Sequence, residues 1–254
     1  WPHPAMALLA RTLALLAMTV ATVAIKVVPL DMAQNSFDDQ YRGCGHAMTA
    51  VLPALNNIEF QKNPHFAKGW AVAQAEWRKQ GSPVSPLASP AQAVALMAYT
   101  MQHLYKDFNA AVRTAGRSRQ EYRNNFHFKT LHFLLTKALM TLRHAQNEQC
   151  HRVFRGVRDV RFQARRGQRV RFGQFTSTSQ RKEIALHFGT DTIFEVHTCH
   201  GAAIRQFSMY PWEEEVLIPP FETFKVTKVT RNGKRTRISL RSEGTFSKYN
   251  CEWL

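Results

Sequence analysis

Residues 207–221 read FSMYPWEEEVLIPPF, a stretch that sets three consecutive carboxylates, Glu213, Glu214 and Glu215, between an aromatic turn and an apolar run. The chain as a whole carries a formal net charge of +16, so a packed acidic triplet is out of character. Successive side chains of a β-strand point to opposite faces, so a strand here would place Glu213 and Glu215 on one face and Glu214 on the other. Two like charges side by side are unfavourable unless a cation lies between them. We therefore expect chemistry at the Glu213/Glu215 pair.

Strand patterns surround this stretch in the C-terminal half of the chain. The short mixed or alternating runs are residues 151–157, 168–175, 192–197, 221–230 and 236–240. Asn232-Gly233 lies between the last two runs and is typical of a hairpin turn. The consecutive prolines at 219–220 must end or bend the strand that contains Glu215. One short helix is expected over residues 180–188, with Ser179 as its N-cap.

The preceding part of the chain, residues 36–144, carries helical patterns. Residues 91–101 are alanine-rich after a proline, which suits the start of a helix. Residues 128–142 carry an apolar stripe at helical spacing, which is typical of a helix that faces a core. The sequence therefore predicts an α+β protein in which a helical N-terminal part packs on a mostly antiparallel β core.

Residues 6–25 form an apolar segment with one charge, Arg11. The segment is short for a membrane span and fits the hydrophobic region of a signal peptide, with a membrane anchor as the alternative. Met6 has the character of an initiator, so residues 1–5 are interpreted as an artefact of gene prediction. We predict a signal peptide over residues 1–25. The small residues that offer cleavage positions are Ala21, Ala24 and Ala33.

Four cysteines follow the predicted leader, namely Cys44, Cys150, Cys199 and Cys251. An even number in a secreted chain predicts two disulfides, for which three pairings exist. A bond between Cys44 and Cys251 would clasp the ends of a single domain over residues 36–254. Without a CxxC spacing, no zinc site is expected. No lipid-anchor signal follows Cys251, so we expect a secreted protein or a truncated gene prediction.

The strongly basic composition, with a sequence pI near 10.2, favours an anionic partner or a solvated basic surface. A run of arginines lies in a predicted loop and hairpin, and few aromatic residues accompany it. We therefore interpret the run as a solvated face rather than a nucleic-acid surface. Its members are Arg158, Arg161, Arg165, Arg166, Arg169 and Arg171. The chain has no nucleophile-elbow, Walker, zinc-protease or dinucleotide-fingerprint motif.

Two further motifs offer groups for chemistry on an anionic sugar. Arg155-Gly156 ends a predicted strand, where an arginine clamps an anion and a glycine lets a ligand approach the backbone; a solvated arginine is the alternative. The GQFTSTS stretch at 173–179 supplies three hydroxyls, of which a helix cap explains only one, so Ser177 is free to bind a neighbouring carboxylate. Carboxylates stabilise oxocarbenium-like transition states and bind guanidinium groups in bidentate fashion. A solvated acidic edge is the alternative for the glutamates.

In this order, the stretches VFRG at 153–156, GQFTSTS at 173–179 and EEEVLIPPFETF at 213–224 resemble the R-S-E class of mono-ADP-ribosyltransferases. The resemblance is closest to the arginine-specific ecto-enzymes of vertebrates, particularly the avian ones, and it covers the whole mature chain. It implies the ADP-ribosyltransferase fold, with the NAD cleft in the β core. It also implies transfer of ADP-ribose from NAD to protein arginine side chains, with release of nicotinamide. NAD or NADP would be a co-substrate, and no prosthetic group is expected.

The resemblance also implies roles for single residues. Arg155 would hold NAD, and Gly156 would present its backbone to the carboxamide. Ser177 would position the catalytic glutamate, Glu215, which would stabilise the ribose cation as nicotinamide leaves. Glu213 would orient and activate the acceptor guanidinium.

Further residues match family positions around these. The expected NAD contacts are Tyr99, Gln174 and Ser208, and Phe188 is expected to stack on nicotinamide. Tyr210 and Trp212 lie in the turn where the family recognises its protein acceptor. The family pairs Cys44 with Cys251 and Cys150 with Cys199. We expect a monomer without a transmembrane span or a nucleic-acid partner. The alternatives are an NAD glycohydrolase and a secreted basic binding protein for nucleic acid or anionic glycans.

Overall fold

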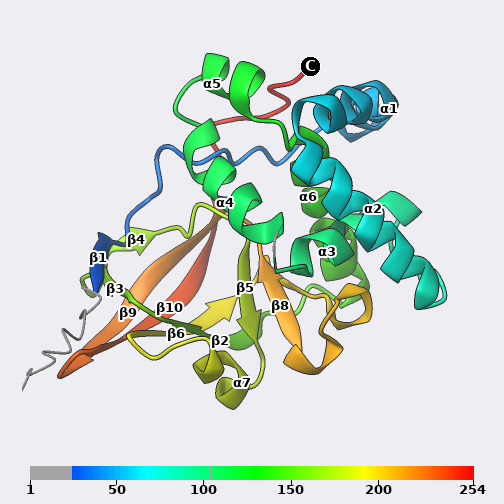
Figure 1. The fold of residues 1–254 in the computed structure, drawn as a ribbon. Coiled ribbons are helices and arrows are strands. Elements are labelled where there is room, and N and C mark those ends of the chain that lie inside the picture. Colours follow the sequence, from blue (N-terminus) through cyan, green and yellow to red (C-terminus); the bar gives the residue numbers. More distant parts are fainter. Residues whose placement is uncertain (1–24, 103) are drawn as a thin grey trace, which may run out of the picture.

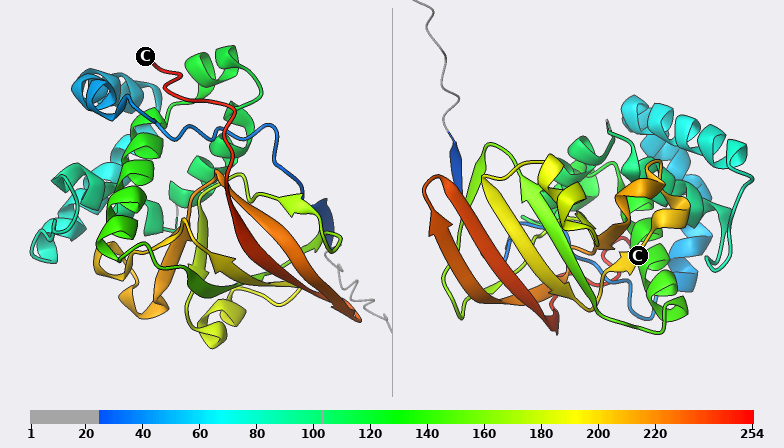
Figure 2. Two further views of the ribbon diagram at one scale, coloured as in Figure 1. Left: turned by 180° about the vertical axis from the view of Figure 1, so that it is seen from behind. Right: turned by 90° about the horizontal axis from the view of Figure 1, so that it is seen from below.

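The computed structural model describes residues 25–102 and 104–254 (Figure 1). The predicted signal peptide falls almost wholly on residues 1–24, which lie outside the described residues. Helices α1 to α6 gather on one side of the molecule, whereas α7 lies by the strands of the large sheet on the other, which confirms the predicted α+β class (Figures 1 and 2). In the described part of the chain, no helix is both long enough and apolar enough to cross a membrane.

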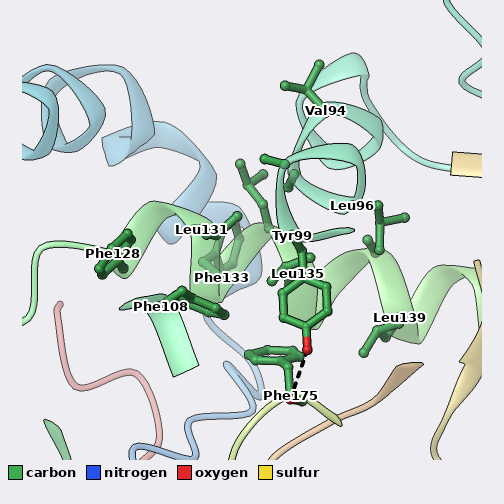
Figure 3. Packing of buried hydrophobic residues seen from close by; sticks show 14 of the residues in the cluster. Val94, Leu96, Tyr99, Phe108, Phe128, Leu131, Phe133, Leu135, Leu139 and Phe175 are labelled. Atoms are coloured by element: carbon green, nitrogen blue, oxygen red, sulfur yellow. Dashed lines mark hydrogen bonds between the residues drawn. The ribbon is translucent and has the colours of Figure 1, made fainter. Parts of the chain in front are cut away.

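Six helices form the N-terminal part. They are α1 (Gly45–Lys62), α2 (Pro64–Lys79), α3 (Pro90–Thr100), α4 (Leu104–Ala115), α5 (Arg119–Asn125) and α6 (Lys129–Ala145). Two of them, α2 and α3, begin at a proline, whose fixed φ suits the first helical position. The centre of this part is α3 packed on α6, and every residue of α3 from Gln92 onward is buried. The phenol of Tyr99 on α3 donates to the carbonyl of Phe175 at 2.9 Å, so this core reaches the sheet (Figure 3).

The strands are β1 (Lys26–Pro29), β2 (His151–Val157), β3 (Val160–Gln163), β4 (Arg169–Val170), β5 (Thr176–Ser179), β6 (Thr192–Thr198), β7 (Ala202–Ala203), β8 (Glu215–Ile218), β9 (Glu222–Asn232) and β10 (Arg235–Thr245). Eight of them form one sheet in the order β4-β9-β10-β6-β2-β5-β8-β7. Its pairings are antiparallel except that of β10 with β6. The hairpin expected at Asn232-Gly233 forms, with Gly233 and Lys234 as its loop, because Asn232 still pairs with Arg235.

The strand predicted over residues 168–175 is wrong beyond Val170. From Arg171 the chain leaves the sheet, because the backbone N–H of Arg171 donates to the carbonyl of Asp31 instead of to a neighbouring strand. The interpretation of Arg171 as solvated is also wrong, since its side chain is 1 % exposed. Its guanidinium donates to Asp38 at 2.6 Å and to the carbonyls of Met32 and Phe246. A buried arginine needs such partners for its charge and donors.

The C-terminal segment is fastened to the segment that leads into α1. Two disulfides form, Cys44 with Cys251 and Cys150 with Cys199, which is the pairing that the resemblance implied. Next to the first bond, the buried carboxylate of Asp39 accepts hydrogen bonds from the backbone of Cys251 and Glu252. The C-terminal segment is therefore held by a covalent bond and by buried acceptors.

The short helix α7 (Lys182–His187) begins later than predicted, and its N-cap is Arg181 rather than Ser179. Ser179 is still part of β5 and pairs with Glu215. Its hydroxyl donates to the carbonyl of Glu213 at 2.6 Å and accepts from the backbone N–H of Arg181. The sheet therefore uses this hydroxyl to fix the acidic turn rather than to cap a helix.

Candidate active site

Three neighbouring strands carry the three motifs. Arg155 lies on β2, Ser177 on β5 and Glu215 on β8, and these strands are adjacent in the sheet. The strands β2 and β5 pair at a single position, Phe154 with Ser179. Beyond that position Arg155 bridges the two strands, because its Nη1 donates to the backbone carbonyl of Ser177 at 2.7 Å. The arrangement brings together the three residues that the sequence placed in separate motifs.

The carboxyl group of Glu215 is the buried acid of the site. Its side chain is 4 % exposed, and its Oε1 has no hydrogen-bond partner among the described residues. Burial raises the pKa of Glu215 to about 7; the nearby hydroxyl of Ser177 lowers it, the charge of Glu213 raises it and Arg155 lowers it. An orphaned buried carboxylate oxygen is costly unless a donor or cation is supplied to it. A cationic ligand could satisfy this oxygen.

Ser177 is supported from the helical side of the molecule. Its hydroxyl donates to the phenol oxygen of Tyr99 at 3.4 Å, and that phenol in turn donates to the Phe175 carbonyl. The amide of Asn109 also donates to the phenol oxygen and to the same carbonyl. Burial, followed by the charge of Glu215, raises the pKa of Tyr99. Tyr99, which was predicted to contact NAD, is buried and holds the start of β5 through its hydrogen bonds to Phe175 and Ser177.

The prediction that Glu213 and Glu215 share one face of a strand is wrong. Glu213 ends a 3₁₀ turn, η2 (Pro211–Glu213), and β8 begins only at Glu215. Between them Glu214 takes the left-handed conformation, with φ 46° and ψ 50°. The turn is pinned to the end of β5, because the Glu214 carbonyl accepts from Gln180 N–H and the Glu213 carbonyl accepts from Ser179. A tight turn, and not a strand, therefore sets the relation between Glu213 and Glu215.

Glu213 is more exposed to solvent than Glu215, since its side chain is only half-buried. Partial burial raises the pKa of Glu213 above its ordinary value. The carboxylate therefore lies at the rim of the site, within reach of a group that arrives from outside. Trp212, beside it, is 62 % exposed, and its ring lies edge-on to Tyr210 at 5.5 Å between centroids. The turn presents an aromatic pair and an acid to solvent.

A cleft of about 630 Å³ opens next to Arg155. On the sheet side its wall includes Arg155, Thr176 and Gln174, and the last of these was predicted to contact NAD. Arg113 of α4 also lines the cleft, and it donates to Gln174 Oε1 at 2.5 Å. The opposite wall is the N-terminal segment, residues 26–35.

Sequence reasoning missed two parts of this cleft. Arg113 stands on an amphipathic helix, where a charged side chain is ordinarily a solvated one. Residues 26–35 lie before the start of the predicted domain, although β1 pairs with β3 in parallel. A run of Val27 and Val28 beside a lysine was the available signal for a strand, and it was short.

Gly156 has a packing reason to be glycine. A Cβ at this position would come within 2.3 Å of the carbonyl oxygens of Gly189 and Ala185. The segment that includes α7 therefore packs directly on the backbone of β2, which only glycine allows. The sequence predicted instead that a ligand would make this close approach.

Ser208 and Phe188 are among the predicted residues that lie outside the cleft lining. Ser208 is fully buried, and its hydroxyl accepts from the backbone N–H of Tyr210, so it shapes the turn before the acidic triplet. Phe188 follows α7 and is 55 % exposed, which leaves an aromatic face open to solvent. Of the predicted residues, Arg155 and Gln174 line the cleft, and Ser177 and Glu215 lie on the two strands next to β2, with Glu213 in the turn before β8.

Comparisons with known proteins agree on one family. The family described as NAD:arginine ADP-ribosyltransferase matches residues 30–248. The chain is 51 % identical to NAD(P)(+)--arginine ADP-ribosyltransferase 2 of Gallus gallus, covering 100 % of this chain and 82 % of that protein. It is 49 % identical to the GPI-linked NAD(P)(+)--arginine ADP-ribosyltransferase 1 of Homo sapiens, covering 89 % and 75 %. The crystal structure of a mutant of the mono-ADP-ribosyltransferase ART2.2 in complex with NADH has a TM-score of 0.76 and 37 % identity, covering 88 % of this chain and 98 % of that chain.

Proposed function

The chain belongs to the NAD:arginine ADP-ribosyltransferase family, and on that premise we propose which of its residues carry out each part of the reaction. It transfers ADP-ribose from NAD to arginine side chains of proteins and releases nicotinamide. NAD acts as a co-substrate, and the reaction needs no prosthetic group. The assignment of roles rests above all on Glu215, a buried carboxylate that has one oxygen without a partner among the described residues and is influenced by Arg155 and Ser177.

Glu215 stabilises the positive charge that develops on the ribose. The bond between ribose C1 and nicotinamide breaks with its electron pair going to nicotinamide, so C1 gains oxocarbenium character. A carboxylate in a water-poor site stabilises such a charge far better than one in bulk water. Ser177 and Tyr99 fix the position of β5 beside it, which avoids reorganisation during the step.

Arg155 binds the anionic part of the co-substrate. One of its donors is used by the Ser177 carbonyl, and it lines the cleft with Gln174 and Arg113 nearby. A guanidinium fixed in this way is a preorganised clamp for phosphate oxygens. The cleft of about 630 Å³ has the size of a small-molecule site.

Glu213 serves the acceptor. A guanidinium is protonated at neutral pH and is a poor nucleophile. The half-buried carboxylate at the rim orients it by hydrogen bonds, and takes its proton as the new bond from nitrogen to C1 forms. The exposed Trp212 beside it offers an aromatic face for the same cation.

Two substitutions test this division. Glu215→Gln is expected to lose transfer and NAD hydrolysis together, by about a hundredfold or more. Glu213→Gln is expected to lose transfer to an arginine analogue such as agmatine, while nicotinamide release in water persists. Glu214→Gln is the matched control and keeps both reactions. The measurement follows nicotinamide release and ADP-ribosyl-agmatine from one labelled NAD sample. Full transfer by Glu215→Gln would contradict the assignment, and a wild-type enzyme that yields only free ADP-ribose would be a glycohydrolase.

We further propose that the protein acts as an extracellular monomer whose catalytic domain begins before residue 36. The two disulfides support an oxidising secretory route. Residues 26–35 form one wall of the cleft, which supports including them in the domain. A shortened chain that starts at residue 36 is expected to bind NAD more weakly than one that starts at residue 26. Light scattering of the mature protein would measure its mass in solution.

A further inference from the structure

A row of basic residues crosses five adjacent strands of the sheet. The strand registers pair Arg169 with Lys225, Lys225 with Arg241, Arg241 with His197, and His197 with Arg152. Directly paired residues point to the same face of a sheet. These five residues therefore lie on one face, and at the usual strand spacing they span about 19 Å. We call them the cationic row.

Four residues of the cationic row are exposed and His197 is half-buried, whereas the opposite face of the sheet holds the core. The residues adjacent to it in sequence, Val153, Val196, Leu240 and Val226, are paired in the same register and are all buried. Arg155 shares the buried side and lines the cleft. The cleft beside Arg155 and the cationic row are therefore on opposite faces of the sheet. The pairing of Phe154 with Ser179, and of Ser179 with Glu215, places Glu215 on the face of the row, but two strands beyond β2. Seen from below, β9, β10 and β6 lie toward the viewer with no described helix across them (Figure 2).

The charge of this face is positive in sum. Next to the row, Lys228 on β9 pairs with Ser239, and Arg237 lies two residues before Ser239 on the same face. Two carboxylates lie beside the row, and each has a basic partner. Glu195 accepts from Arg152 at 2.9 Å, and Glu243 lies 3.9 Å from Lys225. Several cations, including Arg241 and Arg237, have no carboxylate partner among the described residues.

We propose that the cationic row is a docking surface for an extended sulfated polysaccharide of the extracellular matrix or cell surface. Sulfate groups repeat along such a chain, and each can accept hydrogen bonds from a guanidinium or ammonium group. A straight row of basic residues across neighbouring strands matches a linear polyanion better than it matches one small anion. The disulfides place the folded protein in an oxidising route, where sulfated glycans are the abundant polyanion.

Single-stranded nucleic acid fits this face less well. Its sequence-tolerant binding relies on aromatic side chains that stack on bases. Phe154 lies two residues after Arg152 on β2, pairs with Glu195 and is half-buried. The Arg152 guanidinium lies 5.7 Å from the centroid of its ring. The two most exposed phenylalanine and tryptophan side chains among the described residues, Phe188 and Trp212, belong to the end of α7 and to the acidic turn instead.

The experiment uses the whole mature protein and heparin as the probe. The row variant carries Arg169→Gln, Lys225→Gln and Arg241→Gln. The control variant carries Lys62→Gln, Lys68→Gln and Arg78→Gln, which remove the same charge from exposed positions on α1 and α2. Heparin affinity is measured at several salt concentrations, with desulfated heparin and a single-stranded DNA oligonucleotide as comparison ligands. Transferase activity on agmatine and thermal unfolding show that both variants are folded.

The row variant is expected to bind heparin more weakly, with a slope of log Kd against log salt smaller by about two to three, as for the loss of three ionic contacts. The control variant keeps most of the affinity, and desulfated heparin binds weakly to the wild type. Both variants retain agmatine modification, because none of the substituted residues lies on β2, β5 or β8 or lines the cleft. Equal weakening in the two variants would show a net-charge effect and overturn the proposal. DNA binding as tight as heparin binding at the same salt would overturn it in favour of nucleic acid.

Discussion

The Nη1 of Arg155 donates to the backbone carbonyl of Ser177 at 2.7 Å, and this bond spans the gap where β2 and β5 stop pairing. One side chain thus closes the sheet and lines the cleft at the same time. The carbonyl uses a single donor of the guanidinium, which leaves the remaining donors for a ligand. The bond therefore fixes the direction of the group that we assign to NAD.

Replacing Arg155 by lysine keeps the charge and removes the planar fork. An ammonium cannot hold the Ser177 carbonyl and a phosphate in the same rigid geometry. We expect kcat/KM for NAD to fall by about tenfold or more, the equivalent of about 1.4 kcal/mol. Arg152→Lys is the control, because Arg152 is on the same strand but faces away from the cleft and pairs with Glu195. Steady-state kinetics that respond equally to both variants would contradict the role of Arg155.

The protonation of Glu215 links activity to pH. Its pKa is raised to about 7, and the ionised form is the one that stabilises a cation. We expect kcat/KM to rise with pH through about pH 7. A pH profile that is flat between pH 6 and pH 8 for the wild type would argue against an ionised Glu215 in the reaction.

The same carboxyl links stability to pH with the opposite sign. The folded state binds this proton more tightly than the unfolded state does, so stability is lost as pH rises from about 4.5 to about 7. Glu215→Gln removes that loss. The difference in unfolding free energy between the variant and the wild type should therefore be about 3 kcal/mol more favourable to the variant at pH 8 than at pH 4. Urea unfolding at the two pH values measures it, and equal differences at both would contradict a buried, raised carboxyl.

Glu214 tests the turn between the two acids. Its left-handed conformation is unfavourable for a residue with a Cβ and worse for a β-branched one. Glu214→Gly should keep transferase activity and raise stability by about 1 kcal/mol. Glu214→Val should lose about 1–3 kcal/mol and misplace Glu213, so transfer to agmatine falls more than NAD hydrolysis. Thermal unfolding and product analysis together check both, and an inactive Glu214→Gly would mean that the carboxylate itself is needed.

The buried pair of Arg171 and Asp38 supports the cleft from behind. Both side chains are fully buried, and Arg171 also holds the carbonyls of residues 32 and 33 in the segment that walls the cleft. Asp38→Asn leaves the arginine charge without a counter-ion, so unfolding free energy should fall by about 3–5 kcal/mol and the KM for NAD should rise. The exposed pair Arg152 and Glu195 is the comparison, where Glu195→Gln should lose less than about 1 kcal/mol in urea unfolding.

Much of the fold could be predicted because the signals are local. The apolar stripe of residues 128–142 became α6, the alanine-rich stretch after Pro90 became α3, and the glycine at 233 closed the hairpin of β9 and β10. These patterns work because neighbours on a helix face or across a tight turn are only a few residues apart. The α+β class and the order of the three motifs followed from the sequence for the same reason.

The failures concern partners that are distant in the chain. Arg171 looked solvated among other arginines, yet it pairs with Asp38, far away in sequence. Arg113 is an exposed residue of α4, and its contact with Gln174 at the cleft could not be predicted from the sequence. No periodicity reports on such contacts, because they depend on how whole elements pack.

For the acidic triplet, too, some features follow from the sequence and others only from the tertiary structure. From the order of residues alone it follows that carboxylates lie between an aromatic turn and an apolar strand, and that an arginine motif and a serine motif come before them. The folded chain was needed to establish that β8 begins at Glu215, that Glu214 turns through a left-handed conformation, and that Glu215 is buried while Glu213 stays at the rim. Strand boundaries and burial depend on pairing with β5 and on packing against the helical part, and both of these partners lie far from the triplet in the chain.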